Sequence, residues 1–228
     1  MKKETSHWAQ IYQTDINKKG GNLPYILRKI EKKQKLVNLV RKYVDTEGNK
    51  TNSIIECGSG TAAVSIHLST LGYNVTAIDI EEEVLKLSHQ LAEDYFATLE
   101  ENKGKITFEK KSIFELDYKE NTFDVAFSNG VLEHFNDDEI IEIIKQQLFV
   151  AKTTIVGIPT KYFESKEAKY GNERVLELSY WRKLINTAGG KIIEEIGMDR
   201  EPFRKRIVNF KKYFKPKPYH LFVVKNTK

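Results

Sequence analysis

Two acidic residues each end a short apolar run, and both could face one ligand. Glu56 closes the run "SIIE", and Asp79 closes "YNVTAID". A turn with Gly58 and Gly60 follows the first acid, and with Ala63 it matches the pattern G-x-G-x-x-G/A. Such a turn usually holds a pyrophosphate on backbone N–H groups at a helix N-terminus. The alternative is a strand-to-helix turn that binds no ligand.

Glu56 distinguishes between the kinds of ligand that this turn could bind. A carboxylate two residues before Gly58 would repel a pyrophosphate in the same crevice, whereas it would attract an amine and a sulfonium. S-adenosylmethionine carries both of these groups, has no phosphate, and offers a ribose diol that Asp79 could bind. Open α/β sheets bind ligands at the carboxyl ends of their strands, where both acids are expected. The pattern therefore favours S-adenosylmethionine over a dinucleotide.

The elements that must position these acids alternate between strand and helix. Residue periodicity predicts an α/β fold of the Rossmann-like type, with a seven-stranded, mostly parallel sheet, helices on both faces and an antiparallel last strand. A capping box, with Asn136 as N-cap and Glu139 three residues later, marks the start of one helix. The expected helices are 26–44, 61–71, 81–101, 136–148 and 178–188, and the expected strands are 53–56, 73–79, 105–112, 122–129, 153–159, 189–197 and 219–225.

The motifs "IIECGSGTA", "VTAID", "KSIFELDYKENTFDVAFSNGVLEHF" and "TTIVGIP" resemble, in order, those of class I S-adenosylmethionine-dependent methyltransferases. The resemblance covers residues 50–198 and is closest to the group that methylates small molecules. It implies that Glu56, Gly58 and Gly60 form the first motif, that Asp79 binds the ribose, and that Ile80 lies beside the adenine. Ala62 stands where these enzymes often have a third glycine.

The same resemblance implies roles for five further residues. Ser112 replaces an aspartate that contacts the adenine amino group in many relatives, so this contact would fall to the Ser112 hydroxyl and to main-chain atoms beside Ile113. The main chain of Asn129 would lie near the methionine part of the cofactor. Tyr12 would close over the cofactor from an N-terminal helix, or else pack on the body. His134 would act as a base or orient the acceptor, or else bond a loop carbonyl.

Composition and length bound the remaining possibilities. The 228 residues are expected to form a single methyltransferase domain, with an N-terminal helical cap at 1–45, a cofactor-binding core at 50–198, a basic lid at 199–218, and a last strand and tail at 219–228. The polar N-terminus, the lack of a long apolar run and the single cysteine favour a cytoplasmic protein without a membrane span. Cys57 is expected to be a small buried residue, and the histidine, cysteine and acidic residues show no metal-ligand spacing.

Charge separates the chain into an acidic middle and two basic ends. Residues 1–35 and residues 199–218 each carry a net charge of +6, whereas residues 36–198 carry −9. Two basic segments around one crevice favour an anionic small-molecule acceptor, methylated on oxygen or nitrogen. The tetrad 128–131 lacks the consecutive prolines found in enzymes that methylate DNA adenine, which argues against DNA. RNA methylation and a non-catalytic binding protein with this fold remain the alternatives, and the oligomeric state stays open.

Overall fold

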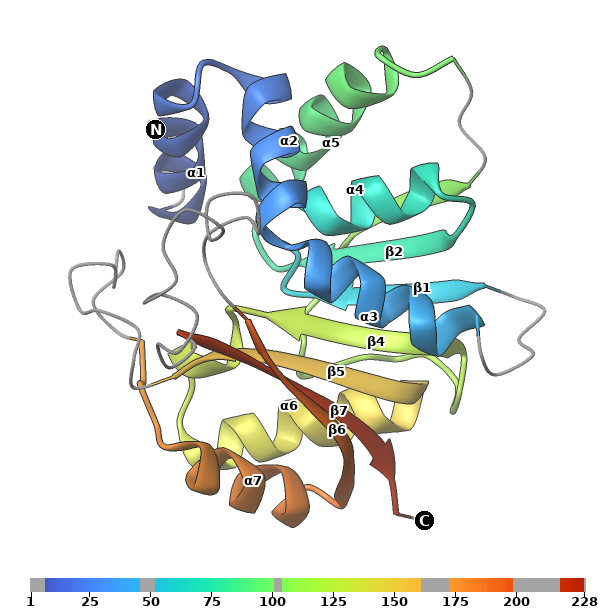
Figure 1. The fold of residues 1–228 in the computed structure, drawn as a ribbon, viewed down its shortest axis with the longest axis vertical. Coiled ribbons are helices and arrows are strands. Elements are labelled where there is room, and N and C mark those ends of the chain that lie inside the picture. Colours follow the sequence, from blue (N-terminus) through green and yellow to red (C-terminus); the bar gives the residue numbers. More distant parts are fainter. Residues whose placement is uncertain (1–6, 46–51, 101–103, 161–172, 199–217, 228) are drawn as a thin grey trace, which may run out of the picture. The chain divides into compact units, whose positions relative to one another are not determined.

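A computed structural model describes residues 7–45, 52–100, 104–160, 173–198 and 218–227. Its seven strands form one sheet in the order β3-β2-β1-β4-β5-β7-β6 (Figure 1). Strand β7 (Tyr219–Asn226) is antiparallel to both of its neighbours, β5 (Ala151–Pro159) and β6 (Gly190–Met198). The predicted mostly parallel sheet with an antiparallel last strand is thus confirmed. The basic segment predicted as a lid lies outside the described residues, apart from residue 218.

The chain divides into two compact units, Met1–Asp117 and Tyr118–Lys228. In the first unit, β1 pairs with β2 and β2 pairs with β3, all in parallel. Helices α4 and α5 pack on β2 and β3, and α2 packs on both of these helices. The bounds in this unit are α1 His7–Lys18, α2 Asn22–Lys32, α3 Gln34–Asp45, β1 Ser53–Cys57, α4 Ala63–Thr70, β2 Asn74–Asp79, α5 Glu82–Phe96 and β3 Lys105–Lys110.

The single helix predicted over residues 26–44 is wrong, because the chain breaks there into α2 and α3. Lys33 leaves the helical conformation, with φ −100° and ψ 11°. The buried residues of α2 are Tyr25, Ile26 and Ile30, whereas those of α3 begin at Leu36. Periodicity could not separate the two helices, since the apolar spacing continues across the break.

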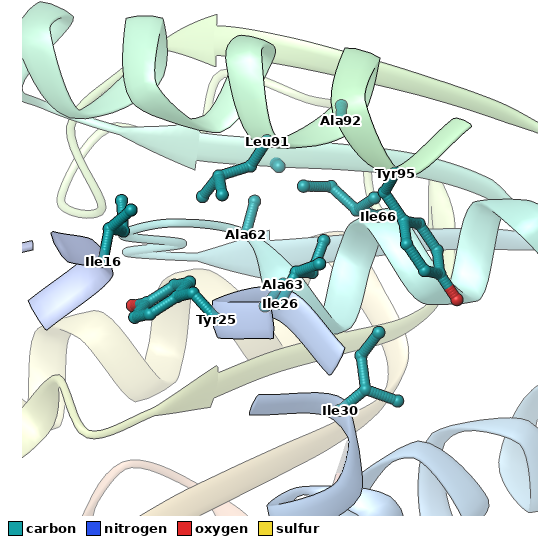
Figure 2. Close-up of a cluster of buried hydrophobic side chains, with 11 residues drawn as sticks. Ile16, Tyr25, Ile26, Ile30, Ala62, Ala63, Ile66, Leu91, Ala92 and Tyr95 are labelled. Atoms are coloured by element: carbon teal, nitrogen blue, oxygen red, sulfur yellow. The ribbon is translucent and has the colours of Figure 1, made fainter. Parts of the chain in front are cut away.

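Helix α2 buries its apolar face on the start of α4. Figure 2 shows Tyr25, Ile26 and Ile30 in one buried cluster with Ala62 and Ala63, at the beginning of α4. The two alanines present only methyl groups, so the α2 side chains can approach the backbone of the glycine-rich turn closely. The N-terminal helices of this unit are therefore packed on the segment that follows the first acidic residue.

The second unit contributes β4 (Phe123–Asn129), α6 (Asp137–Val150), α7 (Leu178–Thr187) and the strands β5, β6 and β7. Strands β4 and β5 are parallel. The predicted capping box is confirmed, because the Glu139 N–H donates to Asn136 Oδ1 at 3.1 Å and the Asn136 N–H donates to Glu139 Oε2 at 2.9 Å. This box fixes where α6 begins, and thereby the length of the loop between β4 and α6. Within the residues described, no helix combines the length and apolar character needed to cross a membrane.

One buried side chain of α6 has unsatisfied polar atoms. Gln147 is fully buried, and neither its Nε2 nor its Oε1 finds a hydrogen-bond partner among the described residues. An unpaired buried amide loses its hydration without compensation, so it lowers stability.

Gln147→Met should therefore raise the free energy of unfolding by about 1–2 kcal/mol, since methionine has a similar length and no polar group to desolvate. Urea denaturation followed by circular dichroism measures the change. Gln146→Met is the matched control, because Gln146 is half-buried and already donates to Glu142 at 3.0 Å; its effect should stay within about 0.5 kcal/mol. A less stable Gln147→Met protein would contradict the unsatisfied state of this amide.

Candidate functional site

The glycine-rich turn joins β1 to α4 in a conformation that needs small residues. Gly58 and Gly60 have φ values of +69° and +53°, in the left-handed region that glycine adopts without steric cost. Ala62 also has a positive φ, +50°, and its side chain is fully buried. The Ala62 N–H donates to the Ser59 carbonyl at 2.8 Å, which closes the turn. Ala62 is therefore in a strained backbone conformation for a residue with a side chain. Its methyl group packs in the buried cluster with the side chains of α2.

Asp79 ties this turn to the end of β2. Its Oδ2 accepts the Gly60 N–H at 2.9 Å, and its Oδ1 accepts the Glu81 N–H at 3.1 Å. The Ser59 N–H donates to the Ile78 carbonyl at 2.8 Å, so the turn is held by main chain as well. A carboxylate has about four acceptor positions, and these two bonds leave capacity for two hydroxyl donors of a diol. Burial raises the pKa of Asp79, and its backbone donors oppose that rise.

Glu56 lies under the turn with little access to water. Its side chain is 7% exposed, and the Ser65 hydroxyl donates to its Oε2 at 2.5 Å. Burial raises the pKa of Glu56 to about 8, although the bonds from Ser65 and the charge of Lys33 both lower it. Near pH 7 and without a bound cation, this carboxyl therefore holds a proton. A cationic ligand would restore the negative charge that the sequence suggested.

Tyr12 of α1 contacts the turn directly. A Cβ placed on Gly60 would lie 2.6 Å from the Tyr12 hydroxyl oxygen, closer than real side chains approach. Trp8 stacks on the Tyr12 ring with a centroid distance of 6.1 Å. Of the two arrangements that the sequence left open for Tyr12, the structure has its hydroxyl against the glycine turn. Whether it also covers a ligand stays a prediction.

The apolar residues predicted beside the adenine follow β2 and β3 at the same edge of the sheet. Ile80 is 66% exposed, an unusual position for a large apolar side chain directly after a strand. Asp79 is paired with Lys110, and the Lys111 N–H donates to the Asp79 carbonyl at 3.0 Å, so Ser112 and Ile113 come just after the last pair of β2 and β3. Ile113 is buried, at 9% exposed. The Ser112 hydroxyl accepts the Phe114 N–H at 3.2 Å and keeps its own hydrogen for another acceptor.

The second unit holds the two remaining predicted residues, Asn129 and His134. Asn129 ends β4, and its Oδ1 is buried without a hydrogen-bond partner within the described part of the chain. This oxygen lies 2.6 Å from the position of a Cβ placed on Gly157. His134 ends a short 3₁₀ turn, Leu132–His134, and is half-buried. Both residues belong to the second unit, and their part in binding a cofactor or an acceptor remains a prediction.

Several residues that contact the turn were not predicted from the sequence. Ser65 donates to Glu56 from the first turn of α4, nine residues later in the chain. Ser88 of α5 donates to the Gly60 carbonyl at 2.7 Å, and Tyr25 pairs with Thr61 through their hydroxyls at 3.2 Å. Only the position of Ser65, one turn into a helix after an acid-bearing strand, gave a usable signal.

The turn also contains a polar atom with no partner. Ser59 is 8% exposed, and its hydroxyl oxygen has no hydrogen-bond partner in the described structure. A buried hydroxyl in this state calls for an explanation, and a ligand bound at the turn is one that could satisfy it. Together with the spare acceptor capacity of Asp79 and the exposed Ile80, it fits a nucleoside ligand that carries a cationic tail.

Cys57 is fully buried, and burial raises the pKa of its thiol, so it is inert as a nucleophile, as predicted. Across the described ranges, no three histidine, cysteine or acidic side chains gather in a way that could hold a metal ion.

Comparison with known proteins shows what the fold resembles. Residues 55–148 match the family model described as a methyltransferase domain. Magnesium protoporphyrin IX methyltransferase from Synechocystis PCC 6803, solved with bound S-adenosylhomocysteine, is similar in structure with a TM-score of 0.70 at 15% identity, over 98% of this chain and 96% of that one.

Two further solved structures share the fold with other chemistry. The [4+2]-cyclase SpnF has a TM-score of 0.62 at 15% identity, over 84% of this chain and 80% of that one. Geranyl diphosphate C-methyltransferase from Streptomyces coelicolor A3(2), in complex with Mg²⁺, geranyl diphosphate and S-adenosylhomocysteine, has a TM-score of 0.62 at 8% identity, over 85% of this chain and 78% of that one. At these identities the likeness concerns the fold, and the acceptor has to be argued from this chain.

The contact between Tyr12 and Gly60 can be tested by a double-mutant cycle. Gly60→Ala should lower the free energy of unfolding by about 2–3 kcal/mol, because the new methyl group meets the Tyr12 hydroxyl and the residue keeps a left-handed φ. In a Tyr12→Phe background, which lacks the closest oxygen, the same change should cost about 1 kcal/mol less. Urea denaturation gives all four values. Equal costs in the two backgrounds would show that Tyr12 does not lie over Gly60.

Proposed function

We propose that this chain is a class I S-adenosylmethionine-dependent methyltransferase and that it transfers the methyl group to an oxygen or nitrogen of a small anionic molecule. The observation that carries the proposal is the pair of acids, Glu56 and Asp79, at the carboxyl ends of the adjacent parallel strands β1 and β2. They suit the ammonium and the ribose diol of this cofactor, whereas a dinucleotide offers the diol without the ammonium.

The candidate residues of the first unit bind different parts of the cofactor. Asp79 accepts the ribose hydroxyls while its backbone bonds keep the turn in place. Glu56 receives the amino group, and the Ser65 hydroxyl orients its carboxyl. Ile80 lies beside the adenine with Ile113 next to Ser112, and the Ser112 hydroxyl oxygen accepts from the adenine amino group.

The bound cofactor supplies a methyl group on a sulfonium, which is an excellent leaving group. The chain has to align the acceptor with this methyl, exclude water and remove a proton where the acceptor carries one. His134 is the residue that we assign to proton removal, because it lies in the loop directly after β4, at the carboxyl end of that strand. Asn129 at the end of β4 borders the same loop.

The acceptor class rests on charge. Residues 1–35 and 199–218 each carry a net charge of +6, and basic segments of a chain attract anions. A carboxylate or phosphate compound is therefore the preferred acceptor. Basic segments also suit RNA, so the first experiment compares a panel of carboxylate- and phosphate-bearing metabolites with bulk RNA and measures release of S-adenosylhomocysteine. Release with RNA alone would overturn the small-molecule proposal, and release with neither would favour a binding protein.

Glu56 gives the cofactor site a proton signature. Since its pKa is raised to about 8 by burial, it is mostly protonated at pH 7, and binding of the ammonium of S-adenosylhomocysteine should expel that proton. Calorimetry at pH 7 in two buffers of different ionisation enthalpy should show release of about one proton per site. The release should shrink as the pH rises past 8, where the carboxyl is already ionised.

The Glu56→Gln variant should bind more weakly and release no proton at pH 7. Glu93→Gln, which changes an exposed acid on α5, should behave like the unmodified protein. Equal proton release by Glu56→Gln and the unmodified protein would remove Glu56 from the cofactor site.

The role of His134 predicts a kinetic loss without a binding loss. His134→Ala should lower kcat by about 10²–10⁴ with the best acceptor of the panel, and it should remove one ionisation from the pH–rate profile. Affinity for S-adenosylhomocysteine should stay nearly unchanged. His7→Ala, an exposed histidine on α1, should keep full activity. Full turnover by His134→Ala would return His134 to a structural role.

A further inference from the structure

Arg174 binds the main chain on both sides of His134. Its backbone N–H donates to the Glu133 carbonyl at 2.8 Å, and its Nη1 donates to the Phe135 carbonyl at 2.7 Å. Its Nη2 also donates to Asp137 Oδ1 at 2.6 Å, in the first turn of α6. One residue from a distant part of the chain thus makes three hydrogen bonds around His134. Two are to carbonyls of the loop, and the third is to a side chain at the start of α6.

The guanidinium is suited to this task in a way that lysine is not. It is planar and presents several donors in a fixed fork, so two of them reach a carbonyl and a carboxylate at the same time. The Arg174 side chain is 31% exposed and Asp137 is 37% exposed, so the pair is partly screened from water. The Tyr180 hydroxyl also donates to the Asp137 carboxylate, and the bonds from Tyr180 and Arg174 lower the pKa of Asp137. The anchor of Arg174 is therefore a carboxylate that stays ionised near neutral pH.

The loop has a second set of anchors on its other side. Leu132 is fully buried and Glu133 is 4% exposed, so the residues before His134 are held by packing. The His134 N–H donates to the Val131 carbonyl at 3.2 Å. His134 itself is half-buried. The backbone of His134 is therefore held by burial of its neighbours on one side and by Arg174 on the other.

We propose that Arg174 is a positioning residue for His134, acting through the Glu133 and Phe135 carbonyls rather than by contact with substrate. The inference rests on the role proposed for His134 as the base. A base that is misplaced by about 1 Å loses on the order of 10²-fold in rate, so a loop held by these hydrogen bonds is a means of keeping the imidazole in line with its acceptor. The expected consequence of losing Arg174 is a lower kcat at nearly constant cofactor affinity.

The chain offers a matched control in Arg182. This residue also makes a two-point contact, donating from Nε and Nη2 to Glu195 at 2.8 and 2.7 Å, in the same unit of the chain. Glu195 in turn lies 3.2 Å from Nε2 of His220. Removing Arg182 should therefore disturb His220 and leave His134 alone, whereas removing Arg174 should do the reverse.

The first measurement needs no acceptor. In protein labelled with ¹³C-histidine and saturated with S-adenosylhomocysteine, the His134 resonance is assigned by its loss in His134→Ala. Arg174→Gln should shift and broaden this resonance and leave that of His220 in place. Arg182→Gln should shift His220 only. Arg174→Lys, which keeps the charge with fewer directed donors, serves as the second variant if Arg174→Gln does not fold, and it should shift His134 less.

The second measurement uses the best acceptor of the metabolite panel. Arg174→Gln should lower kcat by about 10- to 100-fold, while the acceptor KM and the affinity for S-adenosylhomocysteine change by less than about threefold. Arg174→Lys should recover part of this loss. Combined with His134→Ala, Arg174→Gln should cause no further loss, because its effect passes through His134.

The failures of the two proposals are distinguishable. Full turnover by His134→Ala would contradict the base itself. An unmoved His134 resonance in a folded Arg174 variant would contradict the role of Arg174 alone, as would an equal loss of rate in the His134→Ala background.

Discussion

The hydrogen bond from the Gly60 N–H to the Asp79 carboxylate is the constraint on which the candidate site depends. It joins the turn after β1 to the end of β2, so two segments that carry different parts of the site cannot move independently. Residue 60 has no side chain for a separate reason: its φ is +53° and a Cβ there would lie 2.6 Å from the Tyr12 hydroxyl. Asp79 therefore has a structural role before any ligand binds. Its bonds to the Gly60 and Glu81 N–H groups fix the orientation of the carboxylate, and with it the direction of the remaining lone pairs.

The second acid is governed by burial rather than by hydrogen bonds alone. The Ser65 hydroxyl donates to Glu56, but the effect of burial on the Glu56 pKa outweighs both that bond and the charge of Lys33. The two acids of the site are thus held differently before a ligand arrives. Backbone donors oppose the rise that burial causes in the pKa of Asp79, whereas burial raises the pKa of Glu56 to about 8. The protonated carboxyl of Glu56 could offer a neutral or anionic ligand a hydrogen bond, whereas an ammonium would form an ion pair with its ionised form, and this favours a cationic ligand.

The elements that carry the site could be predicted from the sequence, because buried parallel strands read as apolar runs and glycine turns punctuate them. Asn136 and Glu139 marked the start of α6 correctly, since a capping box is local chemistry. The break at Lys33 could not be predicted, because the apolar spacing continues through it. Contacts between distant residues were also beyond reach. The bond from Ser88 to the Gly60 carbonyl and the contacts of Arg174 with the loop around His134 form only when the chain is folded.

The central claim is that two acids at the ends of β1 and β2 select a cationic nucleoside over a dinucleotide. The most direct test is calorimetric titration of the full chain with S-adenosylhomocysteine and, separately, with NAD⁺ under the same conditions. Both ligands offer a ribose diol to Asp79, but only the first presents an ammonium, and the second brings a pyrophosphate to the turn above Glu56. The account predicts saturable heat with S-adenosylhomocysteine and none with NAD⁺. Saturable binding of NAD⁺ with no heat from S-adenosylhomocysteine would contradict it.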